Sequence, residues 1–311
     1  MRLTPELKQR VRSARGRFAA MAAAYFLGAF NDNFYKQAAL LLAVEAGRGE
    51  LQGLGAALFA LPFIVFAAPA GWLADRFSKK HVIIAVKLLE LAATIIGGIG
   101  LLTMNWSLML AMVCLMGLQS TIFGPAINGS VPELYPEAYV TRANALLKLC
   151  TTLAILIGMA LGGAALDQGW FPDVAARFAG PDAGPDGAGR SLAAAGAVAA
   201  SLLGVAAALF VVKRPAMGPS ARFPWSGPWA SLRDCLAVRR DRLLTLAFAG
   251  NGFFYGVSSL AVLVINSLGV GQLGFSKTAT SLLSVSLMLG VAGGALLAGR
   301  MTHRSEEHTS E

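Results

Sequence analysis

The sequence predicts an all-α membrane protein that crosses the bilayer several times. Hydrophobic residues make up 56% of the 311 residues and charged residues only 14%, which is too little charge to solvate the surface of a water-soluble domain of this length. The apolar residues also cluster in blocks of about 20, enough helix to cross a hydrocarbon core of roughly 30 Å. The 35 glycines suit membrane helices that pack closely against one another.

Eight apolar blocks are long enough to be membrane spans. The polar, basic residues 1–17 precede them, and we expect this segment to lie in the cytoplasm. The expected spans are Phe18–Val44, Leu54–Ala74, Val82–Leu102, Leu108–Val131, Asn144–Leu166, Leu192–Val212, Leu243–Ser267 and Thr278–Ala298.

The distribution of basic residues predicts the orientation of these spans. Cytoplasmic loops of membrane proteins are enriched in Lys and Arg. With the N-terminus in the cytoplasm, nineteen of the 26 Lys and Arg residues fall on the cytoplasmic side and four on the opposite side. The four are Arg48, Arg177, Arg190 and Lys277, and the remaining Lys36, Lys87 and Lys148 lie within spans.

A basic, proline-containing segment, residues 213–242, divides the chain into two parts. Six expected spans lie before it, within residues 18–212, and two after it, within residues 243–299. The two parts also resemble each other: Asn31 and Tyr35 of span one align with Asn251 and Tyr255 of span seven, and Gly71 aligns with residue 294 at nearly the same offset. A parallel repeat of this kind is typical of two-bundle transporters.

The chain therefore predicts a complete first bundle and the first two helices of a second. Residues 300–311 are expected at the cytoplasmic end, and the abruptly polar run Arg304–Glu311 is similar to translated sequencing-adapter sequence. This predicts a non-native tail, and an ordinary soluble tail is the alternative.

The net charge of +9 does not indicate nucleic-acid binding, because the basic residues occupy short loops and build no continuous basic face. Cys114, Cys150 and Cys235 lie far apart and lack the spacing of metal ligands. We therefore expect no nucleic acid, no metal and no bound cofactor.

The loop between spans two and three carries the most specific local pattern. It combines Gly71, Asp75, Arg76, Lys79 and Lys80 and resembles the signature loop of the major facilitator superfamily. A positive-inside loop alone explains the basic residues but not the glycine and the aspartate. The resemblance implies conformational gating without substrate contact, and a major-facilitator-type helical bundle: six helices, then two of the second bundle.

Span one carries polar residues at its middle. Asn31, Asp32, Asn33 and Lys36 lie where each ionisable group costs about 3 kcal/mol to insert. Asp32 and Lys36 are four residues apart, so they share a helix face and can pair. The pattern favours a cavity that coordinates a cation, couples to protons or contacts a headgroup, with a structural ion pair as the alternative.

Span three carries a second pair of charges, Lys87 and Glu90, near its expected cytoplasmic end. We expect Lys87 to extend towards the membrane surface with Glu90 satisfying it locally, and a role in transport is the alternative.

Further polar residues are candidates for the same cavity. Span four contains Gln119 and Asn128, with Pro125 expected to kink the helix at mid-span. In span seven, Asn251 and Tyr255 mirror the polar residues of span one and are expected to line the opposite wall.

Five further segments form a distinctive set: Phe26–Phe34, Ala70–Asp75, Val86–Glu90, Phe123–Pro125 and Arg142–Leu146. Together they resemble the bacterial lysophospholipid transporters, including the form fused to an acyltransferase and an acyl–acyl carrier protein synthetase. The resemblance implies secondary active transport of lysophospholipid across the inner membrane by alternating access, with a coupling ion, H⁺ or Na⁺, and Asp32 in coupling or headgroup binding. Ile127 departs from the pattern, since many members have a lysine there.

Two other functions remain alternatives. One is a drug or metabolite antiporter of the same superfamily. The other is the membrane anchor of a lipid acyltransferase, but His81, His303 and His308 build no acyltransferase motif and no nucleotide-binding loop occurs. We therefore expect no enzyme in this chain, and a fused or separate acyltransferase–synthetase as a partner.

Overall fold

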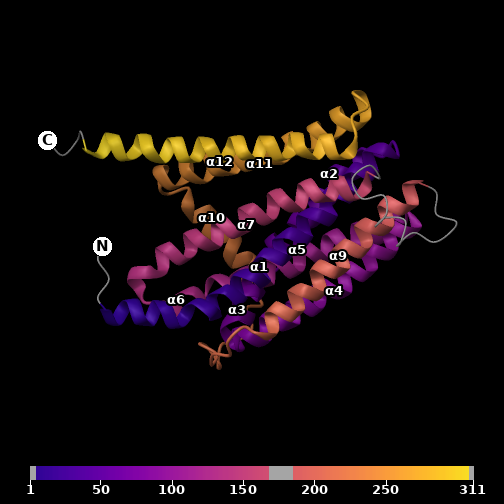
Figure 1. Ribbon diagram of the computed structural model, residues 1–311. Coiled ribbons are helices and arrows are strands. Elements are labelled where there is room, and N and C mark those ends of the chain that lie inside the picture. The colour runs from indigo at the N-terminus through magenta and orange to yellow at the C-terminus, as the bar shows by residue number, and fades with distance from the viewer. Residues whose placement is uncertain (1–4, 168–184, 308–311) are drawn as a thin grey trace.

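The computed structural model describes the backbone of residues 5–167 and 185–307, and the side chains of residues 9–167 and 186–294. Every regular element in these ranges is a helix (Figure 1), which confirms the all-α prediction. The elements are α1 Pro5–Glu45, α2 Glu50–Val65, α3 Ala67–Arg76, α4 Lys79–Thr103, α5 Trp106–Asn128, α6 Val131–Leu134, α7 Glu137–Leu166, α9 Pro185–Leu209, α10 Gly227–Val238, α11 Arg242–Asn266, the π-helical turn η1 Ser267–Gln272 and α12 Lys277–Glu307.

Five helical segments in the described residues are long and apolar enough to cross a membrane, and the bent pair α2–α3 makes a sixth. The five are Lys79–Thr103, Trp106–Leu134, Glu137–Leu166, Asp186–Leu209 and Arg242–Gln272. Helix α1 is not among them, although it is 41 residues long. Its central Asn31-Asp32-Asn33 lowers the hydropathy of every window that contains it.

The expected second span is two helices. α2 and α3 are bent by 54° at their junction, where Phe66 leaves the helical conformation with φ −106° and ψ 8°. Pro69 explains the break, because a proline ring clashes with the carbonyl group four residues earlier. That carbonyl belongs to Val65, the last residue of α2.

Other boundaries also differ from the expectations. α1 begins at Pro5, so most of the basic segment before Phe18 is helical, and the expected linker contains α10. α12 continues to Glu307, into the expected tail, while residues 308–311 lie outside the described residues. The expected mid-span kink at Pro125 is wrong: this proline lies in the last turn of α5.

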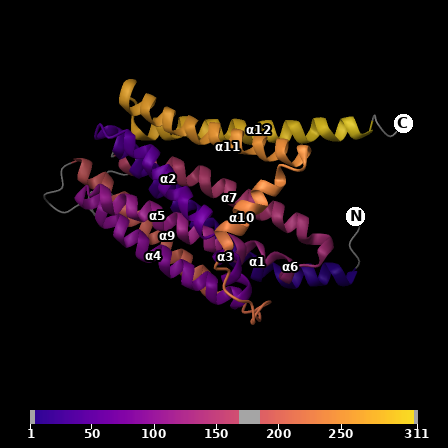
Figure 2. The same cartoon turned by 180° about the vertical axis from the view of Figure 1, so that it is seen from behind.

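α1 lies at the centre of the first bundle and contacts α2, α4, α5, α6, α7 and α9, while α3 packs against α5 (Figures 1 and 2). α1 contacts α7 and α9, and α4 contacts α5 and α9. α7 approaches α1 closely because it presents Gly158 and Gly162: a Cβ atom at Gly158 would lie 2.6 Å from the carbonyl oxygen of Phe30. Small residues permit this contact between helix backbones.

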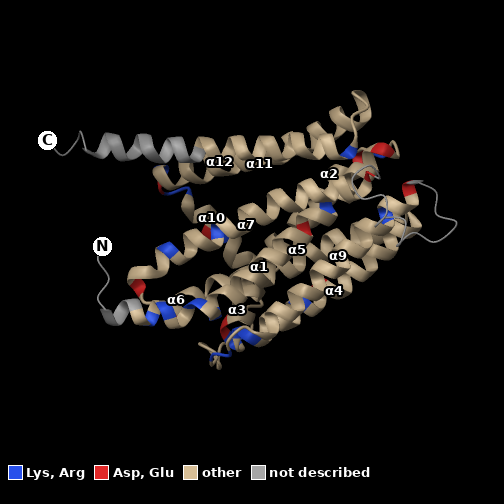
Figure 3. Cartoon of the chain, viewed as in Figure 1, with Lys and Arg blue, Asp and Glu red and all other residues tan. Residues whose placement is uncertain are grey.

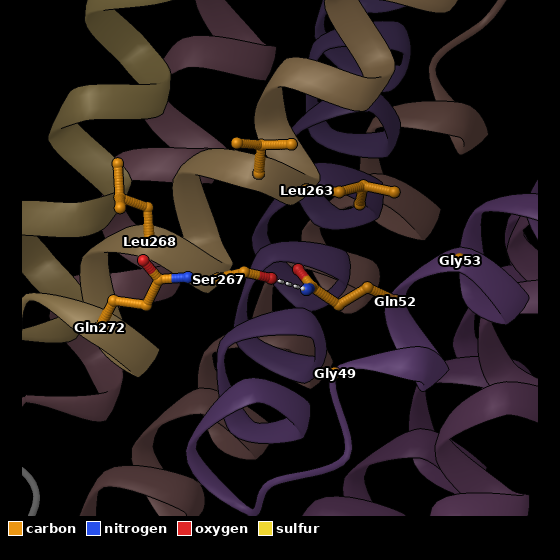
Figure 4. A pocket seen from close by; sticks show the side chains of 8 residues that line it. Gly49, Gln52, Gly53, Leu263, Ser267, Leu268 and Gln272 are labelled. Carbon is orange, nitrogen blue, oxygen red and sulfur yellow. Dashed lines mark hydrogen bonds between the residues drawn. The ribbon is translucent and has the colours of Figure 1, made fainter.

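We call the end of the bundle where α1 begins the near end, and the end where α1 finishes at Glu45 the far end. The hydrogen bonds that join α11 and α12 to the first bundle, within the described side chains, lie at the far end. Gln37 donates to Asn266 at 3.0 Å and to Ser281 at 3.2 Å. Gln52 donates to Ser267 at 2.9 Å beside an open cavity of about 510 Å³ between α2 and α11 (Figure 4).

Asp167 and Lys277 add to these far-end contacts. The carboxylate of Asp167, at the end of α7, accepts hydrogen bonds from the backbone amides of Lys277 at 3.3 Å and Thr278 at 2.7 Å. It therefore caps the first turn of α12, where amide groups lack partners within the helix. The Lys277 ammonium lies 2.6 Å from the carboxylate of Glu45 at the end of α1.

Candidate functional site

A layer of polar side chains crosses the first bundle between two apolar clusters. Each of α1, α4, α5 and α9 contributes apolar residues to both clusters and polar residues between them. The near-end cluster includes Phe18, Met21, Val82, Ile83, Val86, Phe123, Ile127 and Val211. The far-end cluster includes Phe34, Tyr35, Ala93, Leu101, Met112, Met116, Ala193 and Ala197. We call the residues between them, namely Asn31, Asp32, Lys87, Glu90, Thr94, Gln119, Ser120 and Ser201, the polar layer.

Lys87 and Glu90 form an ion pair sealed inside the bundle. The ammonium lies 2.7 Å from the carboxylate, and neither side chain is exposed. The expectation that Lys87 extends to the membrane surface is wrong. Its ammonium instead lies 4.8 Å from the centre of the Phe123 ring, where a cation–π attraction adds to the ion pair. Gly28 makes room for it, since a Cβ atom there would lie 2.6 Å from the Lys87 Nζ atom.

Asn31 of α1 connects this ion pair of α4 to α9. Its amide nitrogen lies 2.9 Å from Ser201 on α9, 3.1 Å from Thr94 and 3.4 Å from Glu90, both on α4. Thr94 also donates to the backbone oxygen of Glu90 at 2.7 Å. The Asn31 amide is thus a second donor to the Glu90 carboxylate beside Lys87, and in the low dielectric of the bundle interior such hydrogen bonds offset the cost of burying the charge.

Asp32 points to the other side of α1 and has different partners. It is 6% exposed and accepts hydrogen bonds from Gln119 at 2.9 Å and Ser120 at 2.5 Å, both on α5. Both donors are neutral, so the structure places this carboxylate in a polar setting without a paired cation. A buried carboxylate of this kind is suited to bind a cation or a proton.

Lys36 and Asn33 lie beside Asp32 on α1. The Lys36 ammonium lies 4.7 Å from the centre of the Phe59 ring on α2, and the three ion pairs found among the described side chains do not include it. The expected pairing of Asp32 with Lys36 is therefore not formed here. Asn33 donates to the carbonyl oxygen of Ala29 at 2.7 Å, one turn back in its own helix.

The remaining cavity candidates lie outside the polar layer. Asn128 is exposed at the end of α5. Asn251 and Tyr255 are exposed on α11, with Tyr255 64% exposed. No hydrogen bond joins these three side chains to Asp32 in the described part of the chain, and their place in a shared cavity stays a prediction.

The signature-loop residues lie at the near end, where Lys79 has the most contacts. It is buried, donates to the backbone oxygen of Gly129 at 3.0 Å, and forms an ion pair with Glu133 of α6. Lys80 donates to the carbonyl oxygen of Leu209 at 2.8 Å. The two lysines therefore connect the start of α4 to α6 and to the end of α9.

Asp75 and Gly71 make no side-chain hydrogen bond or ion pair within the described part of the chain. Asp75 is exposed, and its backbone oxygen accepts from the amide of Gly218 at 2.9 Å. Nothing lies within 4 Å of a Cβ atom built on Gly71, and Arg76, which is half-buried, has no ion pair among the described residues. Their gating role stays a prediction.

Sequence reasoning missed Thr94, Ser201 and Glu133 as part of these networks. Thr94 follows Glu90 by one helical turn, which was a usable signal. Ser201 carried none, because a single serine in an alanine-rich span is common and only the packing of α9 against α4 brings it to Asn31.

Comparison with known proteins agrees with this architecture. The family model described as "Major Facilitator Superfamily" matches residues 21–309. The chain belongs to the Major Facilitator Superfamily. It is accordingly a multi-pass membrane protein of a transporter superfamily rather than a member of an enzyme family.

Curated relatives within this superfamily include the lysophospholipid transporters LplT of Salmonella newport and Salmonella typhimurium. Each is 30% identical to the chain over 283 residues, which is 89% of the chain and 64% of the relative. The chain thus spans less than two thirds of the length of these relatives. Crystal structures of POT family transporters, in complex with a thioalcohol-conjugated peptide or 5-aminolevulinic acid, align over 82% of the chain and 51% of theirs, at 14% identity and a TM-score of 0.47.

Proposed function

We propose that the chain belongs to a secondary active transporter of the bacterial inner membrane that moves lysophospholipid between leaflets by alternating access. The near end would face the cytoplasm, as the distribution of Lys and Arg indicates. The similarity to lysophospholipid transporters supports the substrate class. The observation that carries the proposal is the setting of Asp32, a carboxylate in the middle of the bundle held only by neutral donors.

The headgroup of lysophosphatidylethanolamine has an ammonium and a phosphate. Asp32 offers a carboxylate for the ammonium, and Lys36, one helical turn away, offers a cation for the phosphate. Lys36 would in this way supply the charge of the lysine that many members of the family have at the position of Ile127. Asp32 would also be the group that binds the coupling ion, H⁺ or Na⁺, when no headgroup occupies it.

Far-end contacts support the mechanism. They hold the two parts of the chain together at one end of the membrane, as alternating access requires of a transporter closed on that side. With the near end in the cytoplasm, such a state would be closed to the outside.

Uptake of radiolabelled lysophosphatidylethanolamine tests the proposal. It is measured in cells that lack their own lysophospholipid transporter and that express the whole gene, either wild type or with Asp32→Asn or Lys36→Gln. Glu137→Gln serves as the control, because Glu137 is an exposed carboxylate at the start of α7. We expect both site variants to lose at least about tenfold of the initial rate, the effect of losing one charge-assisted contact, and the control to keep it.

Each other outcome rejects a part of the proposal. Equal uptake by the wild type and Asp32→Asn would exclude Asp32 from binding and coupling. Absence of uptake by the wild type, together with export of cationic drugs from the same cells, would replace lysophospholipid by a drug as substrate. An acyltransferase, fused or separate, is the proposed partner, and conversion of the imported label to phosphatidylethanolamine would report it.

A further inference from the structure

A second site lies at the near end, away from the polar layer. A cavity of about 340 Å³ opens between the first turns of α1, the turn that joins α6 to α7, and the segment that follows α9. Arg10 and Arg17 of α1 and Arg214 of the following segment line it, with Ser13, Glu133 and Tyr135. In Figure 3, blue Lys and Arg residues gather along the first turns of α1, beside α6.

The cavity is strongly positive. Of the described residues that line it, only Glu133 is acidic, and the carboxylate of Glu133 is already paired with Lys79. Among the described side chains, none of the three arginines takes part in an ion pair. The Nε–H group of Arg214 is buried and has no hydrogen-bond partner, and a buried donor of this kind costs free energy until a ligand accepts from it.

Apolar packing holds the first turns of α1 in place. Val11 and Ala14 are each 5% exposed in the near-end cluster, and the Phe18 ring packs edge-on against Tyr135 with 5.4 Å between centroids. Arg10 and Arg17 are seven residues apart, which is two helical turns, so they lie on one face of this anchored helix. The cavity is therefore built by the fold and is more than a set of loosely attached surface arginines.

The depth and the lining of the cavity indicate its ligand. It lies beside the segment immediately before Phe18, where the apolar part of α1 starts, and so at the level of lipid headgroups. Arginine binds phosphate through paired hydrogen bonds, and basic pockets between transmembrane helices bind anionic headgroups. We propose that this cavity binds the headgroup of an anionic phospholipid from the leaflet at the near end. The site is independent of the transported substrate.

Lipid binding to the purified 311-residue chain tests this site. Native mass spectrometry in dodecylmaltoside micelles measures the Kd of dioleoylphosphatidylglycerol, with dioleoylphosphatidylcholine as the zwitterionic comparison. We expect the chain to prefer phosphatidylglycerol. The variant Arg10→Gln/Arg17→Gln/Arg214→Gln should bind it at least about tenfold more weakly, as the loss of charge-assisted hydrogen bonds predicts.

The matched control removes the same charge elsewhere. Arg12, Arg222 and Arg233 are exposed and do not line the cavity, so Arg12→Gln/Arg222→Gln/Arg233→Gln should keep the wild-type Kd. An equal loss in this control would show diffuse attraction and overturn the site. Displacement of phosphatidylglycerol by millimolar inorganic phosphate would overturn the lipid assignment in favour of a small anion.

A lysine variant separates binding from folding. Arg10→Lys/Arg17→Lys/Arg214→Lys keeps the charge that the near end carries but loses the paired hydrogen bonds of the guanidinium groups. Its thermal unfolding without lipid should match that of the wild type while its Kd for phosphatidylglycerol rises. An unchanged Kd in this variant would overturn the arginine geometry as the basis of the site.

Discussion

At the scale of single residues, two buried carboxylates on different helices of the same bundle, Asp32 of α1 and Glu90 of α4, have opposite surroundings. Glu90 is paired with Lys87 and approached by the amide of Asn31, so its charge is compensated within the bundle. Among the described side chains, Asp32 accepts hydrogen bonds from Gln119 and Ser120 and has no ion-pair partner, which is the setting expected of the ligand-binding group proposed above. Neighbouring positions in α1, Asn31 and Asp32, thus serve two different sites because they point to different sides of the helix.

The Lys87–Glu90 pair gives a prediction about stability. Glu90→Met leaves the Lys87 ammonium buried without a counter-charge, and we expect it to lower the free energy of unfolding by about 3–5 kcal/mol. The double variant Lys87→Met/Glu90→Met removes both charges and should recover most of that loss. Unfolding by sodium dodecyl sulfate, followed by tryptophan fluorescence, measures both. A double variant as unstable as the single one would show that the pair is not an isolated charge compensation.

At the scale of helices, the contact between α1 and α7 sets the position of the polar layer. Gly158 and Gly162 let the α7 backbone approach α1 at Phe30 and Phe34, on either side of Asp32. This contact keeps the polar middle of α1 inside the bundle, even though α1 is less apolar than its neighbours. The break at Phe66 has a comparable role, because it lets α2 and α3 both lie against α5.

Gly158→Ala tests the close approach of α7 to α1. The added methyl group would lie 2.6 Å from the carbonyl oxygen of Phe30, so α1 has to shift, at a cost of about 1–3 kcal/mol in unfolding free energy. Gly250→Ala is the matched control, because no atom lies within 4 Å of its Cβ position. The control should be neutral or stabilising by up to about 1 kcal/mol, as the helix propensity of alanine predicts. Unfolding by sodium dodecyl sulfate measures the stability of both variants. Equal stability of the two would contradict the close approach of α7 to α1.

At the scale of the whole molecule, the far-end contacts fix the position of α11 and α12 relative to the first bundle. Gln37, Gln52 and Asp167 of the first bundle bind residues of η1 or α12 and the end of α11. α12 diverges from α1 towards the near end in both views (Figures 1 and 2). A molecule held at one end and separated at the other can open by breaking a small number of polar contacts.

The double substitution Gln37→Ala/Ser281→Ala is expected to weaken the attachment of α11 and α12 to the first bundle at the far end. Spin labels at the exposed Glu50 and Leu273, in a chain whose three cysteines are replaced by serine, report the separation of α2 from η1 by electron–electron double resonance. We expect a longer and broader distance distribution in the variant, because both partners of one buried hydrogen bond are lost. Ser286→Ala on the exposed side of α12 should leave the distribution unchanged. An unchanged distribution in the double alanine variant would show that these contacts do not hold the far end closed.

Much of the fold and part of the site could be predicted from the sequence. The apolar blocks predicted the all-α fold, and the polar middle of span one predicted where buried polar residues gather, since Asp32 and Asn31 are in the polar layer. The expectation for Lys87 was wrong because hydropathy reports how apolar a segment is and not which neighbour covers a given side chain. Phe123 and Ser201, which surround the Lys87–Glu90 network, lie 36 and 114 residues from Lys87 in the printed sequence.

The sequence by itself determined the class of this protein, because the energetic cost of placing charges and unpaired backbone groups in hydrocarbon leaves long apolar segments few structures other than helices. It also determined which residues are unusual in that setting, above all Asp32, Lys36, Lys87 and Glu90. Only the tertiary structure decided which of them pair. A side chain in a bundle is satisfied by whichever helix packs beside it, and that depends on glycine contacts, helix breaks and rotation about the helix axis, which act between segments far apart in the chain.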